Sequence, residues 1–289
     1  MPSLKEVKNR IASVQSTRKI TSAMKMVASS KLHRASAAIE RMRPYEEKLT
    51  TMLRRLLSAT EGCIDSPYTA VRPAERVAVV LVTSNSSLCG GFNGNAIRRF
   101  RSFIAQTKAQ GQTIARVYAI GKRGAEAVRK DGFSLDTDHA TLLDHPKYED
   151  AAKLADELME MFAAGQIDAC HLIYHHFKSS ATQELRLEGY LPLVVDQAAA
   201  DGTVGQLDYI VEPSPADVVR RLLPGVIRLQ LFTAVLDSLA SEHAARVIAM
   251  QVATDNADEL LHELSLQYNK TRQAAITAEL LDIVGGSLT

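Results

Sequence analysis

Apolar residues at the two ends of the chain recur with the spacing of long helices. In residues 3–59 they return every three or four positions in one register, first at Leu4, Val7, Ile11 and Val14 and then at Leu32, Ala35, Ile39 and Met42. A heptad stripe of this kind is typical of a coiled-coil seam. Ser3 and Glu6 have the spacing of a capping box that starts the helix, and Pro44 predicts a kink inside it.

A second helical stretch occupies the C-terminal end of the chain. Ser214, Pro215 and Asp217 form a strong start signal, with serine as the cap and proline at the first helical position. The pattern continues to residue 284, with a kink predicted at Pro224-Gly225 and an end at Gly285-Gly286. At 1.5 Å per residue the two helices would be roughly 80 and 105 Å long. They exceed a compact domain, so we expect them to pair antiparallel, outside the central part of the chain.

The central residues alternate between strand-like and helix-like segments. Short apolar runs predict strands at residues 77–82, 114–120, 169–177 and 182–187, the last two forming a hairpin. Amphipathic segments predict helices at residues 92–110, 123–130 and 148–164. Strands separated by helices indicate an α/β layer.

The predicted fold class is therefore α/β, with a long antiparallel coiled coil of the N- and C-terminal helices and a central Rossmann-like α/β domain. The expected parts are an N-terminal coiled-coil helix at residues 1–59, a linker at 60–75, a central α/β domain at 76–211 and a C-terminal coiled-coil helix at 212–289.

Charge is divided unevenly between the two terminal helices. The whole chain has a net charge of +1, but residues 1–59 contain 13 basic and four acidic residues, whereas residues 215–289 contain six basic and nine acidic ones. Part of the basic face should therefore meet the acidic helix, and the rest needs a partner outside the chain.

Composition excludes several classes of protein. Aromatic residues make up only 5% of the chain and tryptophan is absent, which fits long helices better than a β-sandwich. Cys63, Cys89 and Cys170 are too scattered for a disulfide framework or a cysteine-based zinc site. The sequence has no apolar run of about 18 residues and no apolar core of a secretion signal near its start. We therefore expect no transmembrane segment.

Two segments invite a chemical interpretation, and both are better explained structurally. The small-residue loop at 83–91 precedes a helix but matches no dinucleotide or P-loop pattern, so a turn is favoured over a nucleotide site. On a strand, His171 and His175 share one face while His176 points to the other, which leaves a metal without a third ligand. No nucleophile–base arrangement is visible, and the basic helix lacks the aromatic residues of a nucleic-acid binder. We expect a coiled-coil interaction protein with no catalytic site, cofactor, metal or nucleic-acid partner.

Longer motifs resemble one protein family. The matching segments are residues 11–15, 18–28, 240–246, 253–256 and 268–280 and the loop Leu88-Cys89-Gly90-Gly91. Together they resemble the gamma-subunit family of F-type ATP synthases, of the bacterial type, over the whole length of the chain. Three segments depart from the family. Asn85-Ser86-Ser87 replaces the usual Asp-Arg-Gly, Pro224-Gly225 stands where many relatives have an unbroken helix, and the family's closing Gly-Ala-x-small tail appears as Gly286-Ser287-Leu288-Thr289.

The resemblance implies a rotor that carries out no bond chemistry itself. In this family the terminal helices form the central stalk inside a hexamer of alternating alpha and beta subunits. The α/β domain lies toward the epsilon subunit and the membrane ring of c subunits. Proton flow turns the ring, and the stalk drives the catalytic beta subunits through different states. The implied location is peripheral, on the cytoplasmic face of the bacterial plasma membrane.

The resemblance also implies contacts with the beta subunits for Arg18, Lys19, Met24, Lys25, Arg246, Arg272, Gln273, Thr277 and Glu279. Small side chains and single charges, without a large apolar patch, would let a stalk turn without being held in one position. Two alternatives from other classes remain. One is a basic coiled-coil adaptor or nucleic-acid-associated factor with an α/β domain, and the other is an α/β enzyme whose end helices only dimerise.

Overall fold

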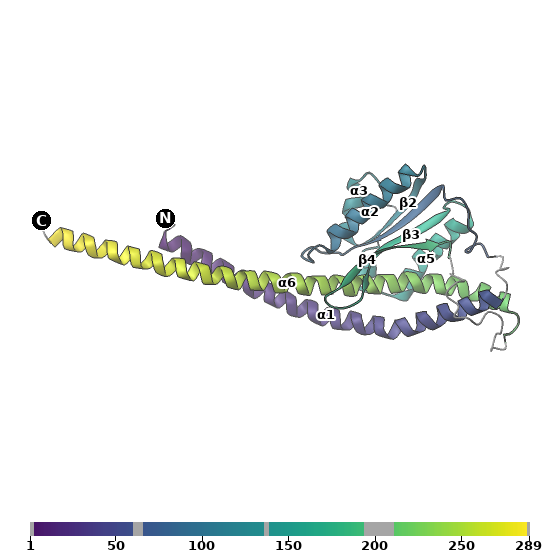
Figure 1. Ribbon diagram of the computed structural model, residues 1–289, viewed down its shortest axis with the longest axis horizontal. Coiled ribbons are helices and arrows are strands. Elements are labelled where there is room, and N and C mark those ends of the chain that lie inside the picture. Colours follow the sequence, from purple (N-terminus) through teal and green to yellow (C-terminus); the bar gives the residue numbers. More distant parts are fainter. Residues whose placement is uncertain (1–2, 60–65, 136–138, 194–210, 288–289) are drawn as a thin grey trace. The chain divides into compact units, whose positions relative to one another are not determined.

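The computed structural model describes residues 3–59, 66–135, 139–193 and 211–287. Figure 1 shows their helices and strands, and these residues divide into two compact units. The first unit combines the residues up to 30 with those from 246 onward, and the second unit comprises residues 31–245. Helices α1 (Leu4–Ala59) and α6 (Pro215–Ser287) each contribute to both units.

The second unit is built on a mixed four-stranded sheet. The strands are β1 (Arg76–Val82), β2 (Thr113–Ile120), β3 (Ala169–Phe177) and β4 (Gln183–Leu191), in the spatial order β2-β1-β3-β4. β1 pairs in parallel with both β2 and β3, and β4 is antiparallel to β3. The predicted α/β class and the predicted hairpin are confirmed.

Helices cover both faces of the sheet because alternate residues of each strand are buried on opposite sides. The helices between the strands are α2 (Phe92–Ala109), α3 (Lys122–Lys130), α4 (Thr141–Asp144) and α5 (Tyr148–Ala163). Val79 and Leu81 of β1 pack with α2 and α3 on one face, and Val80 and Val82 pack with α5 on the other. The sequence predicted all of these helices except the four-residue α4.

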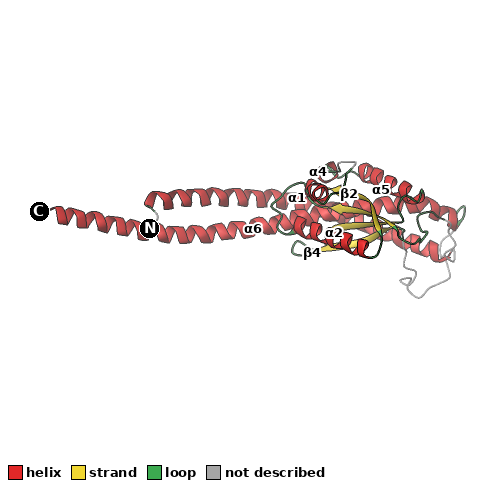
Figure 2. Ribbon diagram, turned by 90° about the horizontal axis from the view of Figure 1, so that it is seen from above, coloured by secondary structure: helices red, strands yellow, loops and turns green. Residues whose placement is uncertain are grey.

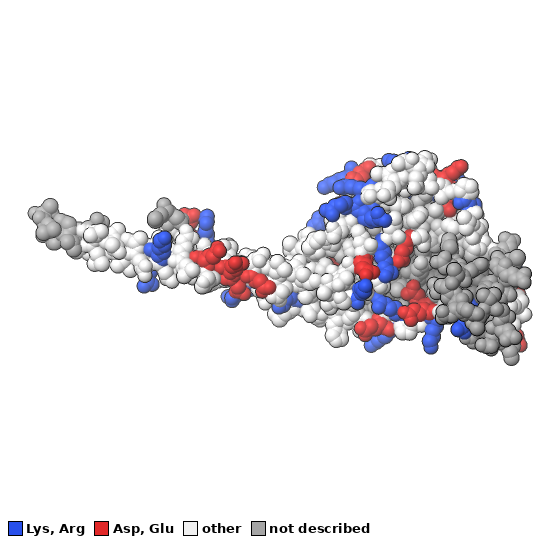
Figure 3. Space-filling view, in the orientation of Figure 1, with Lys and Arg blue, Asp and Glu red and all other residues white. Residues whose placement is uncertain are grey.

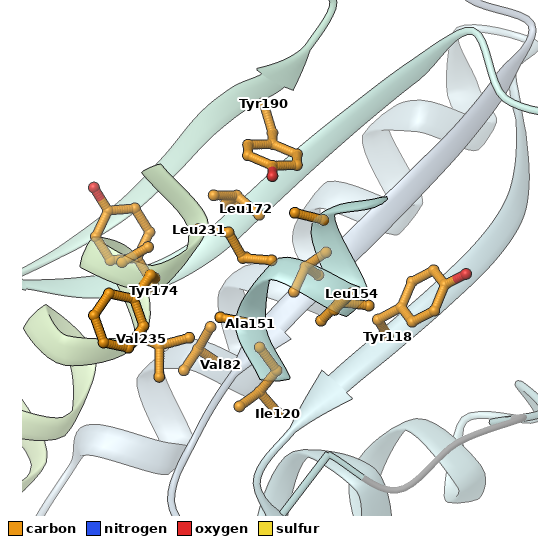
Figure 4. Packing of buried hydrophobic residues seen from close by; sticks show 14 of the residues in the cluster. Val82, Tyr118, Ile120, Ala151, Leu154, Leu172, Tyr174, Tyr190, Leu231 and Val235 are labelled. Atoms are coloured by element: carbon orange, nitrogen blue, oxygen red, sulfur yellow. The ribbon is translucent and has the colours of Figure 1, made fainter. Parts of the chain in front are cut away.

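Both terminal helices contribute to this core through residues within 31–59 and 215–245, so the prediction that they lie outside it was wrong for these parts. Ile39 of α1 and Leu231 of α6 are buried in the same cluster as Val80 of the sheet. Figure 4 shows Leu231 of α6 close to Leu172 of β3 in this cluster. An apolar stripe on a long helix can face a second helix or a sheet, and its spacing is the same in both cases. Neither the spacing of the apolar residues nor the length of the helices therefore shows whether a helix packs on another helix or on the sheet.

The helix ends confirm the predicted start signals and correct one stop signal. The backbone amide of Glu6 donates to the Ser3 hydroxyl at 3.2 Å, and that of Asp217 donates to the Ser214 hydroxyl, also at 3.2 Å. Both helices continue through their internal prolines, Pro44 and Pro224. α6 also runs past Gly285-Gly286 to Ser287, so the predicted end at these glycines was wrong.

One helix of the described chain, α6, is long and apolar enough to cross a membrane by length and composition alone. However, 72% of its most apolar window is buried inside the protein, as in the core helix of a soluble protein. The expected absence of a transmembrane segment stays a prediction.

Candidate functional site

Three polar contacts fix the register of the two helices in the first unit. Arg18 donates to the Asp258 carboxylate at 2.8 Å, the hydroxyls of Thr21 and Thr254 are 2.9 Å apart, and Lys25 donates to Gln251 Oε1 at 2.7 Å. As the α1 residue number rises, that of its α6 partner falls, so the helices are antiparallel, as predicted. They lie side by side along this stretch (Figure 2).

The buried seam between these helices repeats every seven residues. In α1 it includes Val7, Thr21 and Ala28, and in α6 it includes Met250, Ala257 and Leu264. Seven-residue spacing is that of a coiled coil, and small side chains at several of these positions allow the backbones to approach closely. The seam therefore consists of one narrow stripe per helix and leaves most of each helix surface outside it.

The register also shows where α6 loses its partner helix. Residue numbers in the three contacts sum to 275 or 276, so Leu4, the first residue of α1, lies opposite about residue 272 of α6. Beyond this point α6 continues to Ser287 with no α1 residue opposite it. Large apolar side chains are exposed on this stretch at Ile276, Leu280, Leu281 and Ile283.

The candidate contact residues fall into two zones. The paired zone, where both helices are present, contains Arg18, Lys19, Met24, Lys25 and Arg246. The unpaired zone of α6 begins at Arg272 and contains Gln273, Thr277 and Glu279. Both zones belong to the first unit, so the structure brings all nine residues onto one two-helix element.

Several cations of the paired zone already have partners within the chain. Arg18 is bound to Asp258 and Lys25 to Gln251, and Arg246 is half-buried and is not free either. Lys19 is exposed, and Met24 is half-buried. The prediction that part of the basic face meets the acidic C-terminal helix is confirmed at Arg18.

In the unpaired zone, Arg272 and Gln273 are both exposed. The Thr277 hydroxyl donates to the Gln273 backbone carbonyl at 2.9 Å. This bond does not involve the side-chain amide of Gln273. Glu279 belongs to the same helical stretch, but its side chain lies outside the described part of the chain. This zone therefore presents a guanidinium and an amide beside exposed apolar residues.

The surface is more apolar than the sequence predicted. In the paired zone Ile20 is 60% exposed, Met26 64% and Val27 58%, and Ile248 and Val252 of α6 are exposed as well. Large apolar side chains are therefore exposed on this unit beside the small side chains and single charges expected from the sequence. The signal was in the sequence, because Ile20 and Val27 share a face that lies outside the heptad seam.

The central loop is held by its own polar groups, as expected of a turn. The Ser84 backbone amide donates to Asn93 Oδ1 at 2.9 Å. Asn85, one of the residues that departs from the family pattern, donates to the Ala140 carbonyl at 2.8 Å and accepts from the Lys122 backbone amide at 3.1 Å. The Asn85 side-chain amide also donates to the Asp144 carboxylate at 2.9 Å, so Asn85 joins the loop to α3 and to both ends of α4.

The histidines of β3 point as the strand pattern predicted. The His175 ring stacks on Phe92 of α2 with centroids 4.2 Å apart, and His171 lies against Phe103 of the same helix. His176 points to the other face, where its Nδ1 is 2.6 Å from Asp237 of α6. Burial lowers the pKa of His175 to about 4, which favours the neutral ring. In the described residues no three His, Cys, Asp or Glu side chains are grouped to bind a metal ion.

Comparison with known proteins decides the family. A family profile described as ATP synthase matches residues 3–288. The chain is 54% identical over 290 residues to the ATP synthase gamma chain of Bacteroides fragilis, and each protein is covered completely. It is 45% identical over 287 residues to the ATP synthase gamma chain of Flavobacterium johnsoniae, with 99% of this chain and 98% of that protein covered.

The chain belongs to the ATP synthase gamma chain family. The sequence-based assignment to the central-stalk gamma subunit, a non-catalytic component of a bacterial ATP synthase, is thereby confirmed. This assignment replaces the adaptor, nucleic-acid and enzyme alternatives, because the chain matches ATP synthase gamma chains over nearly its whole length.

Solved structures support the fold of this gamma chain. A chain in the mitochondrial ATP synthase of Euglena gracilis (OSCP/F1/c-ring, rotational state 3) aligns with a TM-score of 0.64 at 19% identity, covering 99% of this chain and 93% of that one. A chain in the central stalk/c-ring structure of the Tetrahymena thermophila enzyme aligns with a TM-score of 0.59 at 22% identity, covering 81% of this chain and 99% of that one.

Proposed function

We propose that the first unit is the part of this gamma chain that turns inside a hexamer of alternating alpha and beta subunits. The observation that supports this most is the narrow seam, which ties two helices together while most of their surface stays available. A two-helix element of this kind is slim, and its two sides differ in side chains. Turning it would present a different surface to each of three beta subunits, and so impose a different state on each.

In the paired zone, side chains of the beta subunits would replace partners within the chain for a short time and then be released. Arg18 and Asp258 are both about half exposed, at 44% and 53% of their side-chain surface. An exposed ion pair contributes about 0–1 kcal/mol, so a carboxylate of a beta subunit can compete for Arg18 at little cost. Lys19 is exposed and can meet the same carboxylates directly. Weak exchange of this kind permits repeated release during rotation.

In the unpaired zone, the proposed contact combines hydrogen bonding with apolar packing. Arg272 and Gln273 supply donors for backbone or carboxylate oxygens of a beta subunit. Ile276 and Leu280 lie close by on the same helix and would be covered by the surrounding subunits. Thr277 and Glu279 complete the contact set. A single helix inside a sleeve of subunits can rotate about its own axis without disturbing a partner helix.

The second unit would face the other partners, the epsilon subunit and the ring of c subunits, at the cytoplasmic face of the bacterial plasma membrane. The whole complex would then couple proton flow through the membrane to ATP synthesis or hydrolysis. Support comes from the full-length gamma chain relatives and from the mitochondrial assemblies with a c-ring into which the related folds are built.

Reconstitution with alpha and beta subunits tests this function. The chain alone should show no ATPase activity and no tight ATP binding, whereas its addition should yield a stable assembly whose ATPase activity depends on it. Micromolar ATP binding by the chain alone, or an assembly unaffected by its absence, would contradict the proposal.

A disulfide inside the first unit tests the idea of a rotor that moves as one piece. The hydroxyls of Thr21 and Thr254 are 2.9 Å apart, so the pair Thr21→Cys and Thr254→Cys places two thiols across the seam. Oxidation should leave ATP-driven proton pumping intact, because both cysteines belong to the same rotating part. The unchanged chain treated with the same oxidant is the control. Pumping that stops on oxidation and returns on reduction would show that α1 and α6 must move past each other.

A further inference from the structure

A second basic surface lies on the α/β part of the chain and includes none of the candidate contact residues discussed above. α2 and α3 together carry eight basic residues and one acidic residue. Figure 3 shows Lys and Arg side chains gathered over these two helices. The excess of positive charge that is visible in the sequence lies in residues 1–59, and charge counts do not reveal this second surface.

A groove runs along this surface. One cavity of about 490 Å³ lies between α2 and α3 and is lined by residues that include Arg98, Arg101, Arg123 and Lys130. A second cavity of about 270 Å³ lies along α2 toward its C-terminal end. Arg101 lines both cavities, so they adjoin along α2, and we call the two cavities together the groove. The lining runs from Asn93 to Lys108, which at 1.5 Å per residue is roughly 20 Å of helix.

The groove has an apolar floor and a basic rim. Ile97 lines the first cavity and Phe133 lines the second, and both are partly exposed. The other apolar lining residues, Ala127, Phe100 and Ile104, are buried. Phe100 and Phe133 meet edge to face with ring centroids 6.0 Å apart, which closes the floor between α2 and the segment after α3. The rim therefore selects for negative charge, while the floor offers apolar contact.

Ion pairs within the chain neutralise only part of the rim. Arg101 is held by Asp131 through two bonds, at 2.8 and 2.9 Å, and Arg123 by Glu126 at 3.0 Å. No such carboxylate is recorded for Arg98 or Lys130 in the described residues, and Arg98 contacts only the side-chain oxygen of Asn95, at 3.3 Å. These two cations are available to a ligand.

We propose that this groove binds an extended acidic segment of a partner protein, with carboxylates at Arg98 and Lys130 and apolar side chains on the floor. Charge complementarity favours an acidic ligand, and the length of about 20 Å favours a peptide over a single phosphate group. Its concave, apolar floor favours a protein segment over a membrane surface, because a flat layer of lipid headgroups does not reach into a groove. This inference is independent of the beta-subunit contacts proposed above.

Photocrosslinking in the assembled complex tests the occupant directly. A benzoylphenylalanine in place of Ile97 should crosslink to a protein segment rich in Asp and Glu with interspersed apolar residues. The same group at Lys147, which is exposed outside the groove, is the control. Adducts to lipid, or no adduct above the Lys147 control, would overturn the proposal.

Binding measurements on the full chain separate charge from apolar contact. The probe is a fluorescein-labelled peptide of glutamate and leucine, compared with a lysine–leucine peptide, an all-glutamate peptide and phosphatidylglycerol vesicles. The double variant Arg98→Glu with Lys130→Glu should weaken binding of the first peptide at least about tenfold. The control, Lys147→Glu with Lys153→Glu, makes the same charge change elsewhere and should alter it less than about twofold. Equal binding of the all-glutamate peptide, equal loss in both double variants, or variant-sensitive binding of the vesicles alone would each overturn the proposal.

Discussion

The seam of the first unit and the core of the second differ in how much of each element they bury. Between α1 and α6 of the first unit, the buried positions include Val7, Thr21 and Ala28, each seven or fourteen residues from the last. In the second unit, β1 is buried at every position from 77 to 82, because helices cover both faces of the sheet. A helix pair removes one stripe of each helix from water, whereas a covered sheet removes both faces.

This difference indicates where the chain can tolerate substitutions. A side chain removed from the seam leaves a gap that is open to solvent or can be closed by a small shift. One removed from the sheet core leaves an enclosed cavity. The first unit can therefore vary its surface for partner contacts, while the second supplies most of the stability per residue.

The largest expected effect comes from truncating the core of the second unit. Phe162 of α5 is fully buried, and the guanidinium of Arg72 lies 4.5 Å from its ring centre. Phe162→Ala should lower the free energy of unfolding by about 3–5 kcal/mol, because it removes an aromatic ring and leaves a cavity. Leu264→Ala in the seam should cost less, about 2 kcal/mol, since mainly the transfer term remains. Urea titrations followed by circular dichroism measure both, and equal losses would contradict the comparison.

Burial in the second unit should also make its stability depend on pH. The pKa of His175 is lowered to about 4 by desolvation, against an ordinary value near 6.5. The unfolded chain therefore takes up the proton first as pH falls. The stability that the neutral ring contributes is fully present above about pH 6.5, declines below it, and is lost by about pH 4. Over this range the free energy of unfolding should fall by about 3 kcal/mol. His171 acts in the same direction, because burial lowers its pKa too.

The variant His175→Phe should flatten this pH dependence while keeping an aromatic ring against Phe92. Urea titrations at several pH values between about 7 and 4 provide the measurement. His145→Phe, which replaces an exposed histidine, is the matched control and should leave the slope unchanged. An equal slope in the His175 variant and the unchanged chain would show that another group is responsible.

The strands and helices of the second unit were predictable because each carries its own local signal. The run at 77–82 has no polar residue, and the spacing of His171, His175 and His176 gave the correct faces of β3. What the sequence did not show was which surface each long helix covers. Ile39 belongs to the same stripe as Val7, yet it packs in the sheet core while Val7 packs in the seam. Tertiary contacts decide which surface each part of the helix covers, because the apolar periodicity is the same in both parts.

The candidate site was predictable only in part, for a related reason. Arg18 and Lys25 were identified as basic residues of the helix, but their partners Asp258 and Gln251 are more than 220 positions away. Pairing of this kind depends on the register of the two helices, which charge counts do not specify. The groove between α2 and α3 is hidden in the sequence for the same reason, because its rim comes from two helices.

The seam should respond weakly to the loss of its polar contact. Thr21 and Thr254 share a hydrogen bond, and Thr254 also donates to the Met250 carbonyl at 2.8 Å. Either Thr21→Val or Thr254→Val should cost about 1 kcal/mol, because the other hydroxyl loses a partner. The double variant should cost less than the sum of the two, since no hydroxyl is left unpaired across the seam. Additive losses in a double-mutant cycle would show that the two hydroxyls act independently.

The smallest expected change in free energy concerns Met24, where function should respond more than stability. Met24 is half-buried on the surface that contains the exposed Ile20 and Val27, and its flexible thioether offers a partner a contact with little holding force. Met24→Lys should therefore lower proton pumping per ATP hydrolysed more than it lowers assembly. The added ammonium can pair with an acidic loop of a beta subunit, and that pair must break at each step.

An exposed pair of this kind contributes only about 0–1 kcal/mol, but it favours one rotational position over the others. Assembly depends on a much larger buried surface and should survive. Met26→Lys is the matched control, since Met26 is 64% exposed and lies about 200° around the helix from Met24. Pumping in membrane vesicles, divided by ATP hydrolysis and set beside a count of assembled complexes, measures the effect. If both variants pump alike, or if the loss follows the number of complexes, Met24 has no part in coupling and the paired zone must act through other residues.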